Sequence, residues 1–225
     1  MDVKYSERFY KNLKVFFKAW MRVKYRIECT GLENIPKDTP YILAGNHLNI
    51  LDSWLLITVT NENLRFMVDK KLYNYKIEEW FFKKLGTFEV DPNPKEAAQN
   101  FKAMQTAVRL LRDGEKVAIF PEGRTHSMDV KYKFKDGASL IAKMSKTVIV
   151  PFGIEGTYRP FTKLKIVFGE PIDYKELNLK KEEENDYLEN TVRNLEPFDH
   201  TNVVLLEDKK EDIKTKKLLP NKKCD

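Results

Sequence analysis

The stretch that decides the fold reads Tyr41-Ile42-Leu43-Ala44-Gly45-Asn46-His47-Leu48-Asn49-Ile50-Leu51-Asp52. Its opening residues are apolar, as in a buried strand, and the run breaks at Gly45. The mostly apolar segment that follows Asp52 predicts a short buried helix over 53–60. A strand end that leads into a helix is where α/β proteins often place their chemistry.

Within this stretch, His47 and Asp52 form a candidate catalytic pair. Histidine has an ordinary pKa of about 6.5, which suits a general base near neutral pH. A neighbouring carboxylate would fix its tautomer and stabilise the imidazolium. Positions five apart on a straight helix point about 140° away from each other, so the pair can meet only if Asp52 folds back in the first helical turn. A buried histidine beside an N-cap aspartate, both purely structural, is the alternative.

The rest of the chain predicts a single α/β domain with a central mixed, largely parallel sheet flanked by helices. Its 225 residues, 42% of them hydrophobic, suffice for one sizeable core. We expect an amphipathic helix in 1–26, the α/β domain in 27–198 and a charged tail in 199–225. Strands are predicted at 25–29, 41–45, 64–68, 87–90, 116–120, 147–151 and 163–168, and further helices at 70–84, 94–113, 137–146 and 182–195.

The net charge of +6 is concentrated near the N-terminus. Residues 1–26 contain eight Lys and Arg against two acids, and eight minus two equals the charge of the whole chain. On a helical wheel, aromatic and aliphatic residues form one face, and the cations other than Lys24 form the opposite one. This pattern is typical of a helix in a membrane interface. The alternative is a surface helix that packs its apolar face on the domain. A nucleic-acid partner is not expected, because the aromatics are not interleaved with the cations.

Other sequence features indicate the kind of cellular compartment to expect. The two cysteines do not suggest a disulfide framework, so a reducing compartment is expected. No signal peptide is visible, and no apolar run approaches the roughly 18 residues of a spanning helix.

A second stretch with chemical content, residues 120–126, follows the strand predicted at 116–120. Arg124 would suit a bidentate phosphate contact, and Gly123 would let the backbone approach a ligand closely. A solvated turn with a surface arginine is the alternative. His126 is interpreted as incidental, although it could contact a phosphate.

Together these stretches resemble the glycerolipid acyltransferases, in particular the lysophosphatidate (1-acyl-glycerol-3-phosphate) acyltransferases. Residues 46–52 resemble the Asn-His-x4-Asp block of that family, and residues 120–123 resemble its Phe-Pro-Glu-Gly block. Residues 86–91 and 150–154 resemble the intermediate block and the Val-Pro block, and 31–36 match the lead-in. Four blocks in the right order, over residues 26 to 171, make a specific signal.

The resemblance implies a reaction and a site. His47 would deprotonate the free hydroxyl of an acylglycerol phosphate, Asp52 would orient His47, and the product would be phosphatidic acid. The acyl donor would be acyl-CoA or acyl-carrier protein, with no covalent acyl-enzyme, no metal and no other cofactor. Glu122, Gly123, Arg124 and Lys70 would bind the lysophospholipid acceptor. The enzyme would lie peripherally on the cytoplasmic face of the cell membrane, held there by residues 1–26.

Departures from the family pattern bear on the acceptor. Arg124 directly follows the glycine, whereas the commonest block has threonine between them, and Pro92 stands where the family often has arginine. Asp69, followed by Lys70, takes the place of a usual lysine. The alternatives are transfer to glycerol 3-phosphate or another lysophospholipid, a thioesterase in which His47 activates water, and a non-catalytic membrane-binding relative.

Overall fold

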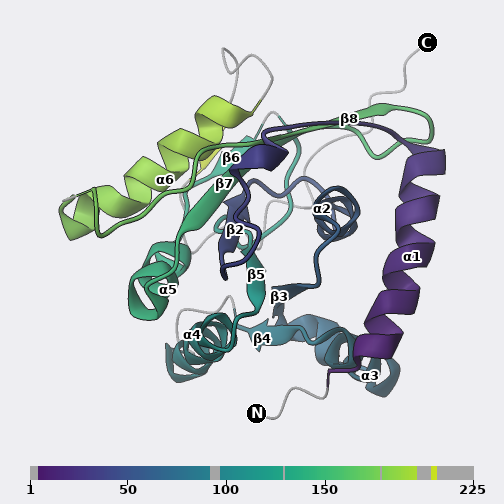
Figure 1. Ribbon diagram of the computed structural model, residues 1–225, viewed down its shortest axis with the longest axis horizontal. Helices are drawn as coiled ribbons and strands as arrows, with labels where there is room; N and C mark the ends of the chain where they lie inside the picture. Colours follow the sequence, from purple (N-terminus) through teal and green to yellow (C-terminus); the bar gives the residue numbers. More distant parts are fainter. Residues whose placement is uncertain (1–4, 92–96, 129, 178, 197–203, 207–225) are drawn as a thin grey trace, which may run out of the picture.

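The computed structural model describes residues 5–91, 97–128, 130–177, 179–196 and 204–206 (Figure 1). A seven-stranded sheet is flanked by helices, which confirms the predicted α/β class. The described α-helices are α1 (Glu7–Lys24), α2 (Asp52–Thr60), α3 (Lys76–Leu85), α4 (Ala97–Arg112), α5 (Gly137–Ser145) and α6 (Lys181–Leu195). The sheet contains β1 (Arg26–Thr30), β2 (Ile42–Gly45), β3 (Leu64–Asp69), β4 (Phe88–Val90), β5 (Lys116–Ile119), β7 (Ile149–Gly156) and β8 (Lys163–Phe168).

The sheet is mixed and largely parallel, as predicted. Its strand order is β1-β8-β7-β2-β5-β3-β4, and β7 and β8 form its antiparallel pair. The central strand β2 pairs in parallel with β7 on one side and β5 on the other. Because parallel strands end at the same edge of a sheet, the segments that follow β2 and β5 meet there.

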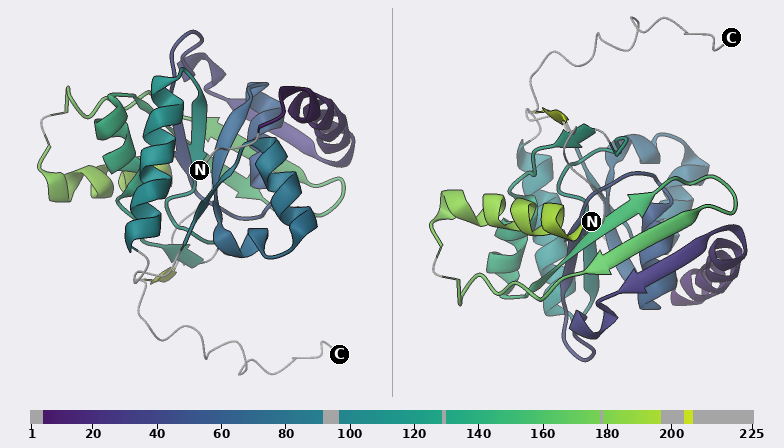
Figure 2. Two further views of the ribbon diagram at one scale, coloured as in Figure 1. Left: turned by 90° about the horizontal axis from the view of Figure 1, so that it is seen from below. Right: turned by 90° about the horizontal axis from the view of Figure 1, so that it is seen from above.

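Two apolar cores cover the two faces of the sheet (Figures 1 and 2). The helices α1, α2 and α3 lie on one face, and α4, α5 and α6 lie on the other. Side chains alternate along β2: Leu43 packs in the first core, whereas Ile42 and Ala44 pack in the second. Both faces of β2 are therefore buried, which explains its continuously apolar sequence.

The N-terminal helix α1 packs on the domain. Tyr10 and Met21 are buried in the first core, and the Tyr10 hydroxyl donates to the carbonyl of Leu64 at 3.1 Å. The structure thus bears out the helix and the packing that the sequence had left as an alternative. Val15 and Phe16 nevertheless stay 69% and 61% exposed. No helix in the described part of the chain is apolar over a length that could cross a bilayer.

Some elements differ from the sequence prediction. The helix predicted over 70–84 is divided into a short 3-10 turn, Lys70–Tyr73, and α3. A small second sheet pairs β6 (Val130–Tyr132) with β9 (Val204–Leu206), two strands too short for their pattern to predict. Pro92 and the start predicted for α4 lie outside the described residues, as does the charged tail apart from β9.

Candidate active site

The candidate site lies where β2 and β5 end side by side. His47 follows β2 by two residues, and Phe120 to Arg124 follow β5. The two segments are joined directly, because the His126 amide donates to the His47 carbonyl at 3.1 Å. Pairing of the parallel strands therefore brings together the two chemical stretches of the sequence, which are separated by about 75 residues.

The exit of the chain from β2 is fixed by Gly45 and Asn46. A Cβ on Gly45 would lie 2.2 Å from the carbonyl oxygen of Phe152, so only glycine allows this approach to β7. The Asn46 side chain is buried and bonds both backbone groups of Ile154, donating to the carbonyl at 2.8 Å and accepting from the amide at 2.7 Å. These contacts extend the β2–β7 ladder to the residue before His47.

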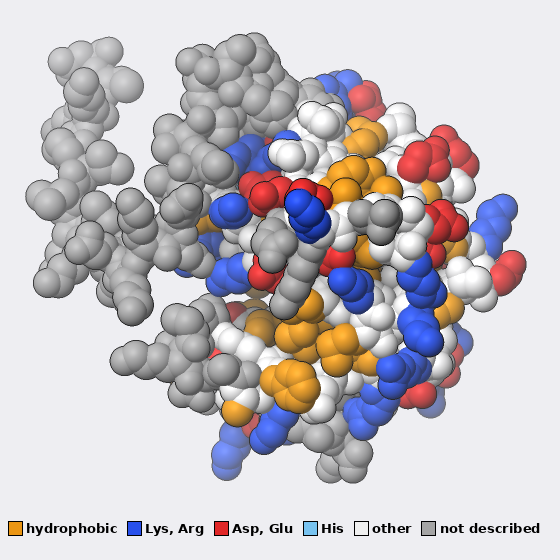
Figure 3. Space-filling view, turned by 90° about the vertical axis from the view of Figure 1, so that its left-hand side faces the viewer, with side chains coloured by type: hydrophobic (Ala, Val, Ile, Leu, Met, Phe, Trp, Pro, Cys, Tyr) orange, Lys and Arg blue, Asp and Glu red, His pale blue; other side chains and the backbone are white. Residues whose placement is uncertain are grey.

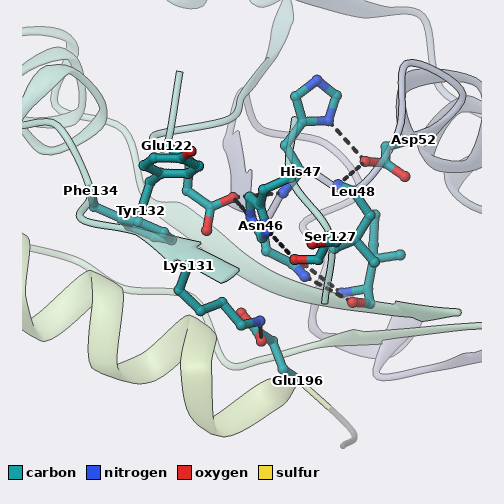
Figure 4. Close-up of polar contacts among 12 residues, drawn as sticks. Asn46, His47, Leu48, Asp52, Glu122, Ser127, Lys131, Tyr132, Phe134 and Glu196 are labelled. Carbon is teal, nitrogen blue, oxygen red and sulfur yellow. Dashed lines mark hydrogen bonds and ion pairs between the residues drawn. The ribbon is translucent and has the colours of Figure 1, made fainter. Parts of the chain in front are cut away.

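His47 and Asp52 meet, as the sequence analysis required. Nδ1 of His47 lies 2.8 Å from Oδ2 of Asp52, which is fully buried as the first residue of α2 (Figure 4). The same carboxylate oxygen accepts the backbone amides of Leu48 and Asn49 at 2.7 and 2.8 Å. The turn that precedes α2 thus folds around the carboxylate, and the pair forms without sharing one helical face.

The His47 ring is held in one plane by Phe120. The two rings stack at 3.8 Å between centroids with 12° between their planes. The His47 side chain retains 17% exposure. Because Nδ1 faces the carboxylate, Nε2 points away from Asp52 (Figure 4) and is the nitrogen that can take a proton from a substrate.

Glu122 occupies a different place from the one predicted. It is fully buried, and its Oε2 accepts the His47 amide at 2.9 Å and faces Nε2 of His126, while Oε1 accepts from Arg193 of α6 at 2.8 Å. Its carboxylate points at the backbone of His47 (Figure 4). Glu122 therefore lies behind His47 and binds its backbone, whereas the family resemblance implied that Glu122 would bind the acceptor.

The charge of Glu122 is stabilised by its partners. Burial by itself raises the pKa of this carboxyl, but His126 and Arg193 outweigh burial and lower it below the usual range. Glu122 is therefore ionised at neutral pH. An ionised carboxylate is a strong acceptor for the His47 amide, so the charge and the position of the base are connected.

The remaining predicted acceptor ligands lie around this core. Gly123 has φ of 70°, a left-handed conformation that suits glycine. Arg124 is exposed and its guanidinium lies 4.6 Å from the ring centroid of Tyr132. Lys70, at the end of the neighbouring strand β3, is paired with Asp91. Their contacts with an acceptor stay predictions.

Sequence reasoning missed Tyr158, Arg193 and the role of His126. Tyr158 stands in an irregular segment 106 residues from its partner Asp52, where no motif marks it. Arg193 lies in the charged helix α6, where no motif marks it, yet it also bonds the Tyr132 carbonyl and Glu196. His126 is buried against Glu122 instead of facing a ligand.

Below Glu122, Lys131 and Glu196 form a further buried ion pair (Figure 4). Burial lowers the pKa of Lys131 to about 8, with the charge of Arg193 acting in the same direction. In the described part of the chain no three His, Cys, Asp or Glu side chains are grouped as metal ligands are.

Comparison with known proteins places these residues in a family context. The family model described as "Acyltransferase" matches residues 26–155. A 1-acyl-sn-glycerol-3-phosphate acyltransferase of Bacillus subtilis (strain 168) is 30% identical over 172 residues, covering 72% of this chain and 82% of that protein. A protein of the same description from Streptococcus pneumoniae is 29% identical, covering 72% of this chain and 61% of the relative.

Two further relatives extend the comparison. A chloroplastic 1-acyl-sn-glycerol-3-phosphate acyltransferase of Arabidopsis thaliana is 29% identical over 149 residues, which are 62% of this chain and 40% of the plant protein. The crystal structure of the 1-acyl-sn-glycerophosphate acyltransferase from Thermotoga maritima matches with a TM-score of 0.65 and 23% identity, covering 82% of this chain and 76% of that one. This structural match supports the fold.

Proposed function

This chain belongs to the acyltransferase family, and on that premise we propose that it acylates the free hydroxyl of 1-acyl-glycerol 3-phosphate to give phosphatidic acid. It is an O-acyltransferase of phospholipid biosynthesis. The observation that carries the proposal is the His47–Asp52 pair, 2.8 Å apart at the end of β2 and inside the matched region. The acyl donor is proposed to be a thioester, acyl-CoA or acyl-carrier protein.

The proposed reaction proceeds by direct transfer. Nε2 of His47 takes the proton of the acceptor hydroxyl while that oxygen attacks the thioester carbonyl carbon. Asp52 accepts a hydrogen bond from Nδ1 and stabilises the imidazolium that forms. When the tetrahedral intermediate collapses, the C–S bond breaks and the leaving sulfur takes the proton back from His47. The steps use this chain's own residues and the two substrates, with no bound metal or cofactor.

Cations at the turn that follows β5 favour a phosphorylated acceptor. Arg124 is exposed at the turn that follows β5, and a guanidinium can bind phosphate with two hydrogen bonds. The Lys135 amine lies 3.1 Å from the position that a Cβ on Gly123 would occupy. A second positive charge therefore lies against the same turn. We propose that the acceptor phosphate binds at this turn, with Lys70 at the end of the adjacent strand β3.

An acceptor panel with a single acyl-CoA tests the proposed function. We expect thiol release to require 1-acyl-glycerol 3-phosphate and to be much slower with glycerol 3-phosphate, lysophosphatidylcholine or no acceptor. A faster rate with one of the first two alternatives would identify another acceptor. Thiol release at the same rate without any acceptor would instead show a thioesterase and contradict the proposal.

We further propose that the exposed side of α1 contacts a lipid surface on the cytoplasmic face of the membrane. Phe16 and Val23 are 61% and 78% exposed on a helix that also carries many cations. Trp80 of α3 is 52% exposed and packs against Phe9 of α1, with 5.4 Å between ring centroids, so apolar surface continues beyond the helix. Apolar side chains flanked by Lys and Arg suit an anionic membrane surface.

The double substitution Phe16→Ser and Val23→Ser tests this surface. We expect the fraction of protein that floats with anionic vesicles to fall several-fold, because each side chain would lose apolar burial in lipid. The matched control is Phe101→Ser, which removes a 51% exposed phenylalanine from α4. The side of the molecule that carries α4, α5 and α6 shows charges of both signs interspersed with apolar patches (Figure 3). Equal flotation of the double variant and the control would contradict the role of α1.

A further inference from the structure

The carboxylate of Asp52 has a second anchor besides His47. Its Oδ2 accepts His47 and two backbone amides, whereas its Oδ1 accepts the hydroxyl of Tyr158. In the described part of the chain no other donor is found for Oδ1. Both oxygens are thus hydrogen-bonded by groups from different segments of the chain, which restricts rotation of the carboxylate about its Cβ–Cγ bond.

Tyr158 is itself held in place by the junction between α1 and β1. Its ring meets the ring of Tyr25 edge-on at 5.6 Å, and Tyr25 is buried. The segment that carries Tyr158 is fixed to the same junction, because the Phe161 amide donates to the Lys24 carbonyl at 2.7 Å and the Arg26 amide donates to the Thr162 carbonyl at 3.0 Å. The hydroxyl therefore reaches Asp52 from a segment that is held in place by the α1–β1 junction.

The protonation state of Tyr158 suits a donor. Burial and the negative charge of Asp52 both raise the pKa of the phenol far above its ordinary value. The titratable groups facing it are Asp52 and Tyr25, and Tyr25 also has a raised pKa because of burial. Tyr158 thus remains a neutral O–H donor throughout the pH range in which an enzyme works.

We propose that Tyr158 is a positioning residue for the acyl transfer, holding Asp52 in the orientation that aligns His47. The inference rests on the proposed function, since it assumes that His47 is the base. Without the phenol, Oδ1 would be a buried anionic oxygen with no donor, and the carboxylate would tilt toward other partners. The bond from His47 Nδ1 would then lose its alignment, and Nε2 would be turned away from the acceptor hydroxyl.

The test compares Tyr158→Phe with Tyr174→Phe. Each substitution removes one tyrosine hydroxyl while keeping the ring, and the Tyr174 hydroxyl donates to the Glu184 carbonyl at 3.1 Å. We expect Tyr158→Phe to lower kcat on the order of tenfold, as for loss of one hydrogen bond to a charged group, with KM for both substrates unchanged. Tyr174→Phe should leave kcat unchanged, and thermal unfolding of both variants reports any loss of fold.

A second measurement does not depend on turnover. The chain contains three histidines, so ¹⁵N-labelled imidazoles give few signals, and His47→Gln identifies that of His47. We expect the Nδ1 proton resonance of His47 to shift or broaden in Tyr158→Phe and to stay in place in Tyr174→Phe.

The outcomes separate the two proposals. Wild-type kcat with an unmoved His47 resonance in Tyr158→Phe would overturn the inference, and so would equal losses of kcat and stability in both tyrosine variants. If the wild-type protein transfers no acyl group, the proposed function fails. A resonance shift confined to Tyr158→Phe would then still show that Tyr158 positions the pair.

Discussion

Replacing His47 with alanine should lower kcat for thiol release from acyl-CoA by about 10²–10⁴-fold, the contribution of a general base. Within the described site, the imidazole of His47 is bonded to Asp52 through Nδ1, and its Nε2 can take the proton of the acceptor hydroxyl. Its loss leaves the buried Asp52 with the Tyr158 hydroxyl and two backbone amides, none of which can serve as a base. The measurement is steady-state turnover with saturating 1-acyl-glycerol 3-phosphate.

Folding must be controlled in this comparison. The Glu122 bond to residue 47 uses the backbone amide and survives the substitution, so we expect the thermal unfolding midpoint of His47→Ala to change little. His47→Gln keeps a polar side chain of similar length and should be equally inactive. Turnover within a few-fold of wild type in either variant, with the fold intact, would refute His47 as the base.

The second large effect is expected on stability. Glu122→Ala should lower the free energy of unfolding by about 3–5 kcal/mol, the cost of breaking a buried ion pair by removing one partner. Arg193 and His126 would both lose their shared carboxylate, and the His47 amide would lose its acceptor. Urea unfolding followed by circular dichroism measures the difference, and activity should fall as well because the base loses its anchor.

Glu184 provides a matched control for this prediction. It is a buried carboxylate that pairs with Lys143, whose side chain is 44% exposed and can turn to water when its partner is removed. Glu184→Ala should therefore cost about 1 kcal/mol or less. Equal losses in the free energy of unfolding for the two variants would contradict the prediction, because they would show that the buried partners of Glu122 add nothing to the cost of removing it.

The pH dependence of the Glu122 effect has a definite sign. The pKa of Glu122 is lower in the folded protein than in the unfolded chain, so its stabilising contribution is fully present above the unfolded pKa. It is lost as pH falls through the folded pKa. The difference in unfolding free energy between wild type and Glu122→Ala should accordingly shrink in the acid range.

The sequence predicted those features that are encoded locally. Apolar runs located β2, β3 and β5, whose side chains pack in the cores on the two faces of the sheet. The sequence also located β8, in which only alternate residues are buried. The meeting of His47 and Asp52 was also predictable, since both residues lie within one turn and Asp52 opens α2. The ordered motifs then identified a family that residue spacing alone could not.

What could not be predicted depends on distant contacts. Glu122 was predicted to bind the acceptor because it lies in a motif of the family. Its environment, however, is set by Arg193, which lies 71 residues away on α6. Tyr158 reaches Asp52 only because β7 lies beside β2 in the sheet. No local pattern specifies which polar side chain a buried carboxylate will meet, and this explains why the pair was found and its supports were missed.

The position of α6 has a consequence for the order in which the protein becomes active during synthesis. A ribosome releases His47, Asp52 and Glu122 well before Arg193, the partner on α6 that completes the charge balance of Glu122. A growing chain therefore contains His47 and Asp52 before it contains Arg193, the cation that pairs with Glu122 behind His47. We therefore expect competence for acyl transfer late in translation, once α6 has emerged and docked, rather than when the motif itself leaves the ribosome.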